Sequence, residues 1–324
     1  MTSILRFIFF ENPYLVVSTN KSRLLGMCGR YVVVTETKII EKKFNVTASP
    51  EFNFEANYNI AAGDKAPVIT CEDPSLLQEF TFGFTPSWAK KKFYVINARA
   101  EGDHNKDNRP DYNGAKGIIR KPFFKQSIRL KRCLVPADAF VEGTTKDKLS
   151  DPFLVHMINK RRPFAFAGVY DQWIDQNSGE IMNSFAIITC PPNKLMSLIP
   201  HHRMPVILEA KDYGVYLDKY ANLQEITELL QPYDHKMMNA YPISTDIKNP
   251  RNKGADLIKP LGDLLQKEYV IGQEQKVQLQ GMGMSPSRRR KLDDKGELEG
   301  YEEIEKEIEK ETDQVKKDLN KRSK

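Results

Sequence analysis

Short runs of apolar residues, separated by turn-forming residues, dominate the middle of the chain. The runs are rich in Val, Ile, Phe and Tyr and are bounded by Gly, Pro, Asn or Asp, which is the pattern typical of β-strands. The strands predicted in this way span residues 31–34, 67–71, 80–85, 94–98, 153–156, 164–170 and 185–189.

Fewer segments show the apolar spacing of a helix. The predicted helices span residues 38–44, 122–131, 192–199 and 222–230. Because helices do not alternate regularly with the strands, the pattern predicts an α+β domain with twisted antiparallel β-sheets rather than a parallel α/β fold.

The regular pattern ends near Leu265, and Gln, Gly and Met then crowd residues 273–284, as in a linker. Beyond the linker, apolar residues recur at helical spacing among dense charges. We interpret this part as a solvated charged tail, with an amphipathic helix as the alternative. The sequence thus predicts an N-terminal extension at residues 1–26, a folded domain at 27–265, and a linker with a charged tail at 266–324.

Composition and charge add little to this picture. Apolar residues make up 40% of the 324 residues, which is ample for a buried core. The formal net charge is +6. The tail contains equal numbers of basic and acidic residues, so the positive excess comes from the rest of the chain. Such an excess permits binding to a polyanion without establishing it.

The same sequence features favour a cytoplasmic protein. No run approaches the roughly 18 apolar residues of a membrane span, and the apolar stretch at residues 4–10 lacks a signal-peptide cleavage site. The four cysteines are widely spaced and form no C-x-x-C pair, which fits a reducing compartment. We therefore expect no membrane attachment, no metal site and no organic cofactor.

Four short segments place a chemically capable residue beside a turn former or a strand end. They are residues 27–31 (Met-Cys-Gly-Arg-Tyr), 97–101 (Asn-Ala-Arg-Ala-Glu), 136–143 (Pro-Ala-Asp-Ala-Phe-Val-Glu-Gly) and 201–205 (His-His-Arg-Met-Pro). Each segment alone is a weak signal, because a lone Cys is usually a small buried hydrophobe and a lone Glu is usually solvated.

The order of these segments is far more specific than any one of them. With Pro86-Ser87-Trp88-Ala89 before the second segment and Arg132-Cys133-Leu134-Val135 before the third, residues 27–265 resemble the SRAP family, the SOS-response-associated peptidases or abasic-site processing proteins. The resemblance implies a barrel-like core flanked by a few helices. It also implies a DNA-damage protein whose partner is single-stranded DNA containing abasic sites, and which is associated with the nucleoid when bound.

The resemblance further implies covalent capture of the abasic-site aldehyde by an N-terminal cysteine, Cys28 here, as a thiazolidine. The α-amine condenses with the aldehyde and the adjacent thiol closes the ring, a step that proximity makes nearly unimolecular. The chain departs from the family pattern because 26 residues precede Met27. Either translation starts at Met27 and that Met is removed, or the extension is cleaved off by proteolysis.

Other roles follow from the matched motifs. Glu142 is expected to act as general acid and base, His201 as a second proton-transfer group, and Asn97 as a group that holds the amine or a sugar oxygen. The residues expected to contact DNA are Arg30, Arg99, Arg203, Trp88 and Pro86. For the three arginines, structural ion pairing with Glu101 or Asp138 is the alternative.

Two other functions remain open from the residues alone. A conventional cysteine hydrolase or peptidase would use Cys28 as nucleophile and His201 as base, and would need no free α-amine. A non-catalytic module that binds single-stranded DNA would need only basic and aromatic residues. The family name also allows autoproteolytic peptidase activity, and imine chemistry allows lyase-like cleavage of the DNA strand.

Overall fold

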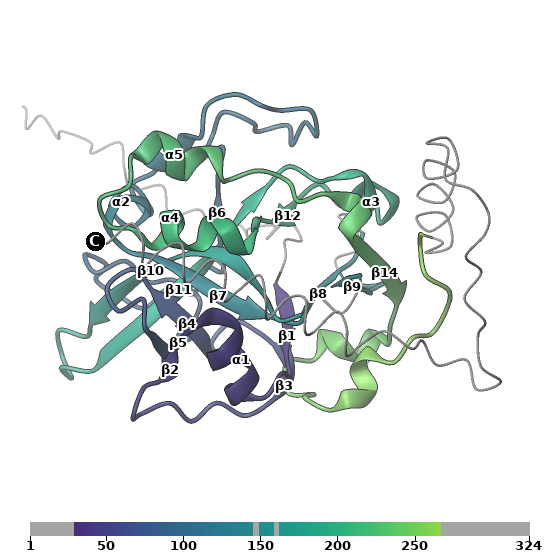
Figure 1. Cartoon of the computed structure of the whole chain (residues 1–324), viewed down its shortest axis with the longest axis horizontal. Helices are drawn as coiled ribbons and strands as arrows, with labels where there is room; N and C mark the ends of the chain where they lie inside the picture. Colours follow the sequence, from purple (N-terminus) through teal and green to yellow (C-terminus); the bar gives the residue numbers. More distant parts are fainter. Residues whose placement is uncertain (1–28, 145–148, 159–161, 267–324) are drawn as a thin grey trace, which may run out of the picture. The chain divides into compact units, whose positions relative to one another are not determined.

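The computed structural model of the protein describes residues 29–144, 149–158 and 162–266 (Figure 1). The predicted extension, most of the predicted tail, and Cys28 itself lie outside these residues. Within the part of the chain that is described, no helix is long and apolar enough to cross a membrane.

A first sheet has five strands, each antiparallel to its neighbours, in the order β14-β9-β8-β1-β3. Its strands are β1 (Arg30–Val33), β3 (Asn57–Ile60), β8 (Ala139–Glu142), β9 (Phe153–Met157) and β14 (Met238–Pro242). β1 lies between β8 and β3, so the beginning of the described chain pairs on both sides with strands that come later in the sequence.

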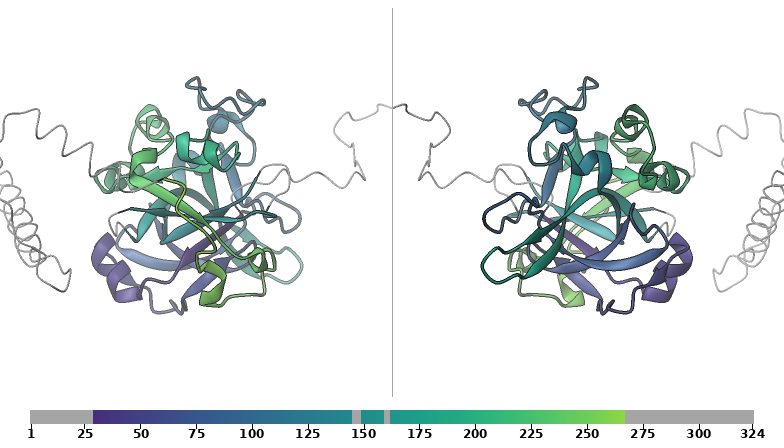
Figure 2. Two further views of the ribbon diagram at one scale, coloured as in Figure 1. Left: turned by 90° about the vertical axis from the view of Figure 1, so that its right-hand side faces the viewer. Right: turned by 90° about the vertical axis from the view of Figure 1, so that its left-hand side faces the viewer.

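A second sheet forms a closed five-stranded barrel. Its strands are β4 (Lys65–Thr70), β5 (Leu76–Phe82), β7 (Arg132–Ala137), β10 (Phe164–Ile174) and β11 (Ile181–Cys190). They pair antiparallel in the order β11-β10-β7-β4-β5, and β11 then pairs with β5 through Phe185 and Phe82, which closes the ring. The side views show these strands wrapping around a common interior (Figure 2).

Barrel closure explains one difference from the predicted antiparallel sheets. Neighbouring strands in a ring of five cannot all alternate in direction, and the β11–β5 pair is parallel. Two added strands, β6 (Asn97–Arg99) on β11 and β2 (Thr47–Ala48) on β5, are parallel to their partners as well. The α+β class and the barrel-like core are confirmed, with β12 (Met204–Pro205) and β13 (Ile207–Leu208) as further added strands.

Aromatic side chains fill the space where the two sheets meet. Tyr31 from β1 packs edge-on against Phe82 and Phe166 of the barrel, with ring centroids 5.3 and 5.9 Å apart. Phe140, from β8, contacts Phe166 in the same way at 6.0 Å. These contacts join both sheets into one core, so the strand that begins the described chain is rigidly seated.

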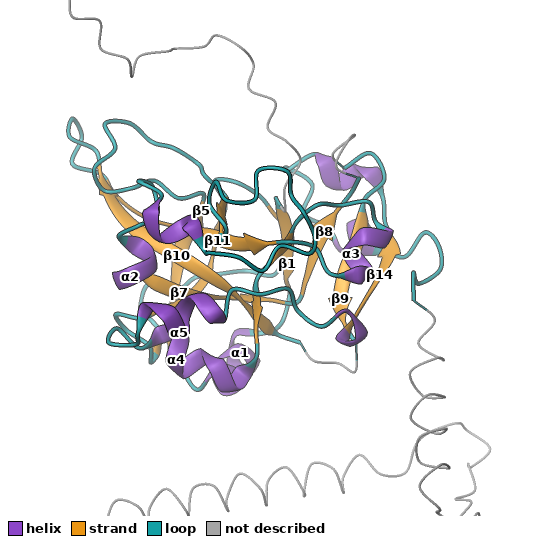
Figure 3. Ribbon diagram, turned by 90° about the horizontal axis from the view of Figure 1, so that it is seen from above, coloured by secondary structure: helices purple, strands orange, loops and turns teal. Residues whose placement is uncertain are grey.

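Helices cover the outside of the sheets at all four predicted places (Figure 3). The α-helices are α1 (Thr37–Phe44), α2 (Ser127–Leu130), α3 (Lys194–Leu198), α4 (Tyr213–Leu217) and α5 (Leu223–Glu228). The 3₁₀ turns are η1 (Gly117–Arg120), η2 (Ala210–Asp212), η3 (His235–Met237), η4 (Thr245–Lys248) and η5 (Ala255–Ile258). Most helices are shorter than predicted, and α4 is an element that the sequence pattern did not predict.

Candidate active site

The start of β1 and the end of β8 lie side by side. Arg30 pairs with Val141 in the antiparallel ladder, and Tyr31 pairs with Phe140. Glu142 is the last residue of β8, and Gly29 directly precedes β1. The chain therefore enters the first sheet next to the carboxylate that the sequence motif singles out.

His201 faces this carboxylate inside the protein. The Nε2 atom of His201 lies 3.2 Å from Oε2 of Glu142, and both side chains are at most 3% exposed. The other ring nitrogen, Nδ1, lies 2.7 Å from the carbonyl oxygen of Gly143. A carbonyl oxygen only accepts hydrogen bonds, so Nδ1 is the nitrogen that bears hydrogen in the neutral ring.

This tautomer has a consequence for proton transfer. With Nδ1 protonated, Nε2 of neutral His201 presents a lone pair to Glu142. A favourable contact then requires one proton, held by Glu142 as a carboxylic acid or by His201 as an imidazolium. The pair can therefore take up or release a proton in a site from which bulk water is excluded.

Asn97 and Arg99 come from β6, which pairs with the C-terminal part of β11. Asn97 pairs with Ile187 and is buried, whereas Arg99 is half-buried. Nη1 of Arg99 donates to the carbonyl oxygen of Asn105 at 3.2 Å. Burial lowers the pKa of the Arg99 guanidinium, and the neighbouring positive charge of Arg203 lowers it further.

Arg203 is turned into the protein and paired with Glu101. Its two terminal nitrogens donate to the two carboxylate oxygens at 2.8 Å each, and Nη2 also donates to the carbonyl oxygen of Thr189 at 2.8 Å. Arg203 is 2% exposed and Glu101 is 0% exposed. Such a geometry favours the structural ion pair over a phosphate contact, because the guanidinium fork is already occupied.

Arg30 keeps partial exposure at the start of β1. Its guanidinium donates to the carbonyl oxygens of Gly29 at 2.9 Å and Lys248 at 3.3 Å. Burial lowers its pKa, and the negative charge of Asp64 opposes this effect. Arg30 thus links the start of β1 to the segment that contains Lys248.

Of the two predicted stacking residues, only Trp88 reaches the surface. Its side chain is 57% exposed and packs edge-on against Phe123, with ring centroids 5.3 Å apart. Pro86 is buried, and its carbonyl oxygen accepts a hydrogen bond from the amide of Ala89 in a turn. Pro86 therefore shapes the loop that presents Trp88 instead of offering a surface to a base.

Asp138 has a role that the sequence did not reveal. Its carboxylate accepts hydrogen bonds from the backbone amides of Val34 at 2.6 Å and Thr35 at 2.8 Å, and from the Thr35 hydroxyl. The amide of Asp138 in turn donates to the carbonyl oxygen of Val32 at 2.8 Å. Asp138 therefore holds the end of β1 and does not pair with an arginine, as one alternative had supposed.

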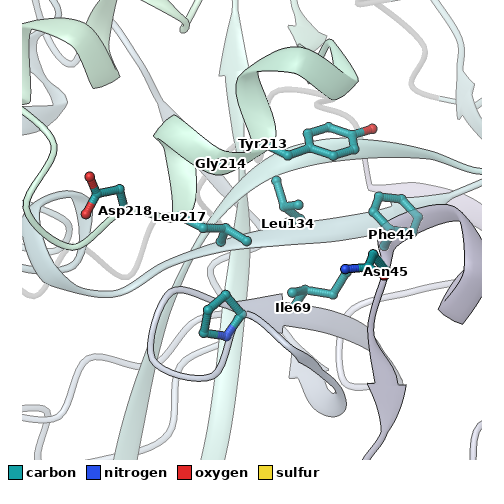
Figure 4. A pocket seen from close by; sticks show the side chains of 9 residues that line it. Phe44, Asn45, Ile69, Leu134, Tyr213, Gly214, Leu217 and Asp218 are labelled. Atoms are coloured by element: carbon teal, nitrogen blue, oxygen red, sulfur yellow. The ribbon is translucent and has the colours of Figure 1, made fainter. Parts of the chain in front are cut away.

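A surface hollow lies away from these residues. It has a volume of about 370 Å³ and is lined by side chains that include Phe44, Ile69, Leu134 and Tyr213 (Figure 4). None of the predicted site residues lines it. Within residues 29–144, 149–158 and 162–266, no group of three or more His, Cys, Asp or Glu side chains is placed to hold a metal ion.

Comparison with known proteins identifies relatives along most of the chain. The family profile described as "SOS response associated peptidase (SRAP)" matches residues 27–250. The abasic site processing protein YoqW of Bacillus subtilis (strain 168) is 32% identical over 239 residues, which are 72% of this chain and 99% of the relative. The abasic site processing protein HMCES of Gallus gallus is 24% identical over 248 residues, which are 65% of this chain and 68% of the relative.

Solved structures include the same fold. A crystal structure of a protein from Bacteroides thetaiotaomicron aligns with a TM-score of 0.60 and 25% identity, covering 72% of this chain and 100% of that protein. The family match, at residues 27–250, contains the barrel, the first sheet and the Glu142–His201 pair.

Proposed function

The chain belongs to the SOS response associated peptidase (SRAP) family, and from this membership we propose that it captures abasic sites in single-stranded DNA through Cys28. The buried Glu142–His201 pair is the main support for this proposal. Glu142 ends the strand that pairs with the start of β1, and β1 begins at Arg30, two residues after Cys28.

The proposed reaction links the sugar of the lesion to the protein without a cofactor. The α-amine of Cys28 attacks the aldehyde carbon, and loss of one water molecule produces an imine. The thiol sulfur then adds to the imine carbon while its proton moves to the nitrogen, closing the thiazolidine ring. The α-amine has a pKa of about 7.7 to 8.0, so enough of it is neutral near pH 7 to act as a nucleophile.

Glu142 is suited to the proton transfers of this reaction. Opening of the sugar ring needs a base at the hydroxyl group and an acid at the ring oxygen, and loss of water needs an acid. A buried carboxyl group 3.2 Å from Nε2 of His201 is placed to alternate between these roles. Cys28 lies outside the described residues, but its peptide bond to Gly29 keeps the two Cα atoms about 3.8 Å apart.

The reaction requires a free α-amine at Cys28, since an amide nitrogen is not nucleophilic. The residues before Met27 must then be absent from the mature protein, through a start at Met27 or through proteolysis. Intact-mass measurement of the natively expressed protein shows whether residues 1–26 are absent, as both routes require, or retained. A mature chain that retains residues 1–26 would rule out thiazolidine formation at Cys28.

A cysteine hydrolase is less well supported by the contacts of His201. In a hydrolase dyad one imidazole nitrogen accepts the thiol proton. Here Nδ1 is bonded to the Gly143 carbonyl oxygen, and Nε2 faces Glu142. A binding module without catalysis is also less well supported, because a buried Glu–His pair is costly to fold and contributes nothing to simple binding.

A denaturing-gel assay tests the proposal. Protein begun at Met27 is mixed with single-stranded DNA bearing one abasic site, beside its Cys28→Ala and Glu142→Gln variants. We expect a denaturant-stable band from the unmodified protein and none from Cys28→Ala. Glu142→Gln should slow band formation by about 100-fold or more, because it removes the general acid and base. Glu180→Gln, at an exposed glutamate, is the matched control and should react at the normal rate.

The outcomes separate the candidate functions. Absence of a band from protein with a verified free Cys28 amine would contradict capture and favour the hydrolase. Binding that disappears entirely at high salt would favour the non-catalytic module, since phosphate contacts weaken with salt whereas a covalent bond persists.

A further inference from the structure

Tyr94 is an exposed aromatic residue that the family motifs do not include. Its side chain is 50% exposed, although its backbone and the near edge of its ring lie against two glycines. A Cβ atom at Gly83 would lie 2.9 Å from Cδ1 of Tyr94, and one at Gly63 would lie 3.8 Å from Cε1. Both glycines have positive φ angles, which residues with side chains rarely adopt. The Tyr94 ring packs directly on the backbone of these two glycines.

Gly63 lies near the end of the first sheet at which β1 begins. Gly63 follows β3 by three residues, and Ile60 at the end of β3 pairs with Tyr31 of β1. Because β1 and β3 are antiparallel, the chain leaving β3 toward Gly63 runs past the start of β1. Tyr94 also precedes Asn97 by three residues on the same segment. The ring therefore packs against the turn that follows β3 and against Gly83, whose neighbour Phe82 contacts Tyr31 of β1.

The segment that bears Tyr94 is held on both sides. The amide of Phe93 donates to the Thr85 hydroxyl at 3.0 Å, and that hydroxyl donates back to the Phe93 carbonyl oxygen. On the other side, Phe84 and Val95 form a β-bridge with N–O distances of 2.9 and 3.2 Å. A ring fixed in this way loses little conformational freedom when a ligand covers its exposed half.

We propose that Tyr94 is a stacking platform for an unpaired base next to the abasic site, an inference that rests on the proposed function. Aromatic rings stack on single-stranded bases whatever their sequence. Trp88, the other exposed aromatic residue of this region, contacts Phe123, which also contacts Phe93, the residue before Tyr94. Two platforms at different places would hold the strand on each side of the lesion.

The main alternative is that Tyr94 only covers the glycine backbone. Tyr94→Leu distinguishes the two roles, because leucine keeps an apolar cover over Gly83 and removes the aromatic face. Tyr94→Phe keeps that face and removes the hydroxyl. Tyr220→Leu is the matched control, since Tyr220 is 94% exposed in the connection between α4 and α5.

The test uses the full chain and fluorescent single-stranded DNA with one tetrahydrofuran residue, an abasic analogue without an aldehyde. Fluorescence anisotropy then reports non-covalent affinity. We expect Tyr94→Leu to bind at least about five-fold more weakly, and Tyr94→Phe and Tyr220→Leu to bind like the unmodified protein. The measurement is repeated with oligonucleotides that also lack the base on one side of the lesion or on the other.

The second set of oligonucleotides identifies stacking directly. If Tyr94 stacks on one neighbouring base, removal of that base abolishes the difference between Tyr94→Leu and the unmodified protein. Equal binding by all variants would overturn the proposal. A loss that persists with both altered oligonucleotides would overturn it as well, because it would indicate a structural effect.

Failure of this inference is distinguishable from failure of the proposed function. Protein begun at Met27 is assayed in parallel for the denaturant-stable band with a true abasic site. A band without any effect of Tyr94→Leu on affinity overturns only the Tyr94 platform. Absence of a band from the unmodified protein overturns capture itself, and the Tyr94 proposal, which rests on capture, is overturned with it.

Discussion

Several charged side chains around the candidate site are buried, and each has a different way of compensating for lost hydration. Arg203 and Glu101 neutralise each other through two short hydrogen bonds. Glu142 faces His201. Lys116 is 9% exposed, and its Nζ atom lies 3.4 Å from Oε1 of Gln231, a neutral partner. Of these groups, Lys116 has the least complete compensation, and burial lowers its pKa.

The pH dependence of stability should reveal this cost. Because the pKa of Lys116 is lower in the folded state, the unfolded chain binds more protons between that pKa and about 10.4, so stability of the unmodified protein rises with pH in this window. Below the folded-state pKa of Lys116, the loss of stability caused by burying its positive charge does not change with pH. We expect Lys116→Met to melt at a higher temperature at pH 7, and the difference to narrow as the pH approaches 10.

The control for this prediction is Lys106→Met, at an exposed lysine of the same loop. It should change the melting temperature little at any pH. A difference between Lys116→Met and the unmodified protein that stays constant from pH 7 to pH 10 would show that the effect comes from packing and not from the buried charge.

At the scale of elements, β1 is a short strand on which the candidate site depends, and it is held at both ends. Arg30 binds carbonyl oxygens at its start, and Asp138 binds the amides of Val34 and Thr35 after its end. The ladders with β8 and β3 fix its sides. A four-residue strand anchored in this way fixes Arg30 opposite Val141, the neighbour of Glu142.

Asp138→Asn should loosen this strand, because an amide nitrogen replaces one of the accepting oxygens. We expect a loss of about 1 to 3 kcal/mol in the free energy of unfolding in urea, together with slower capture of abasic DNA. Asp175→Asn is a matched control, since Asp175 accepts two backbone amides in the distant β10–β11 hairpin. It should lower stability without slowing capture, and equal slowing by both variants would argue against a specific role for Asp138.

For the whole molecule, barrel closure and the joining of the two sheets place every predicted site residue that is described in one compact unit, which ends at Lys267. The barrel strands come from residues 65–82 and 132–190, and the first sheet takes its last strand from residues 238–242. The molecule therefore needs almost all of residues 29–266 to complete its core, whereas none of the described contacts that form the site requires the predicted tail.

Truncation tests this conclusion. A chain that begins at Met27 and stops after Lys267 should melt in one cooperative transition, at the same temperature as the chain that continues to Lys324, and should capture abasic DNA at the same rate. Circular dichroism and the denaturing gel provide the two readouts. A large fall in either stability or capture rate would show that the tail contributes to the domain.

Local patterns in the sequence predicted seven of the fourteen strands that the structure describes and the places of four helices. These elements depend on neighbouring residues, so local spacing is enough to predict them. The strands β7, β8 and β14 were not predicted. The roles expected of Glu142, His201 and Asn97 came from the order of the motifs that resemble the SRAP family, since each segment alone is a weak signal. The parallel closure of the barrel was not predictable in this way, because it follows from how many strands complete the ring.

Only the tertiary structure decided the state of individual side chains. Arg203 and Arg99 were both expected to contact DNA, yet Arg203 is buried against Glu101 whereas Arg99 is half-buried. Pro86 is buried beside the exposed Trp88, and Asp138 binds backbone amides about a hundred residues earlier in the chain. Burial and pairing depend on residues that are distant in sequence, and a local pattern contains no information about which distant residues meet.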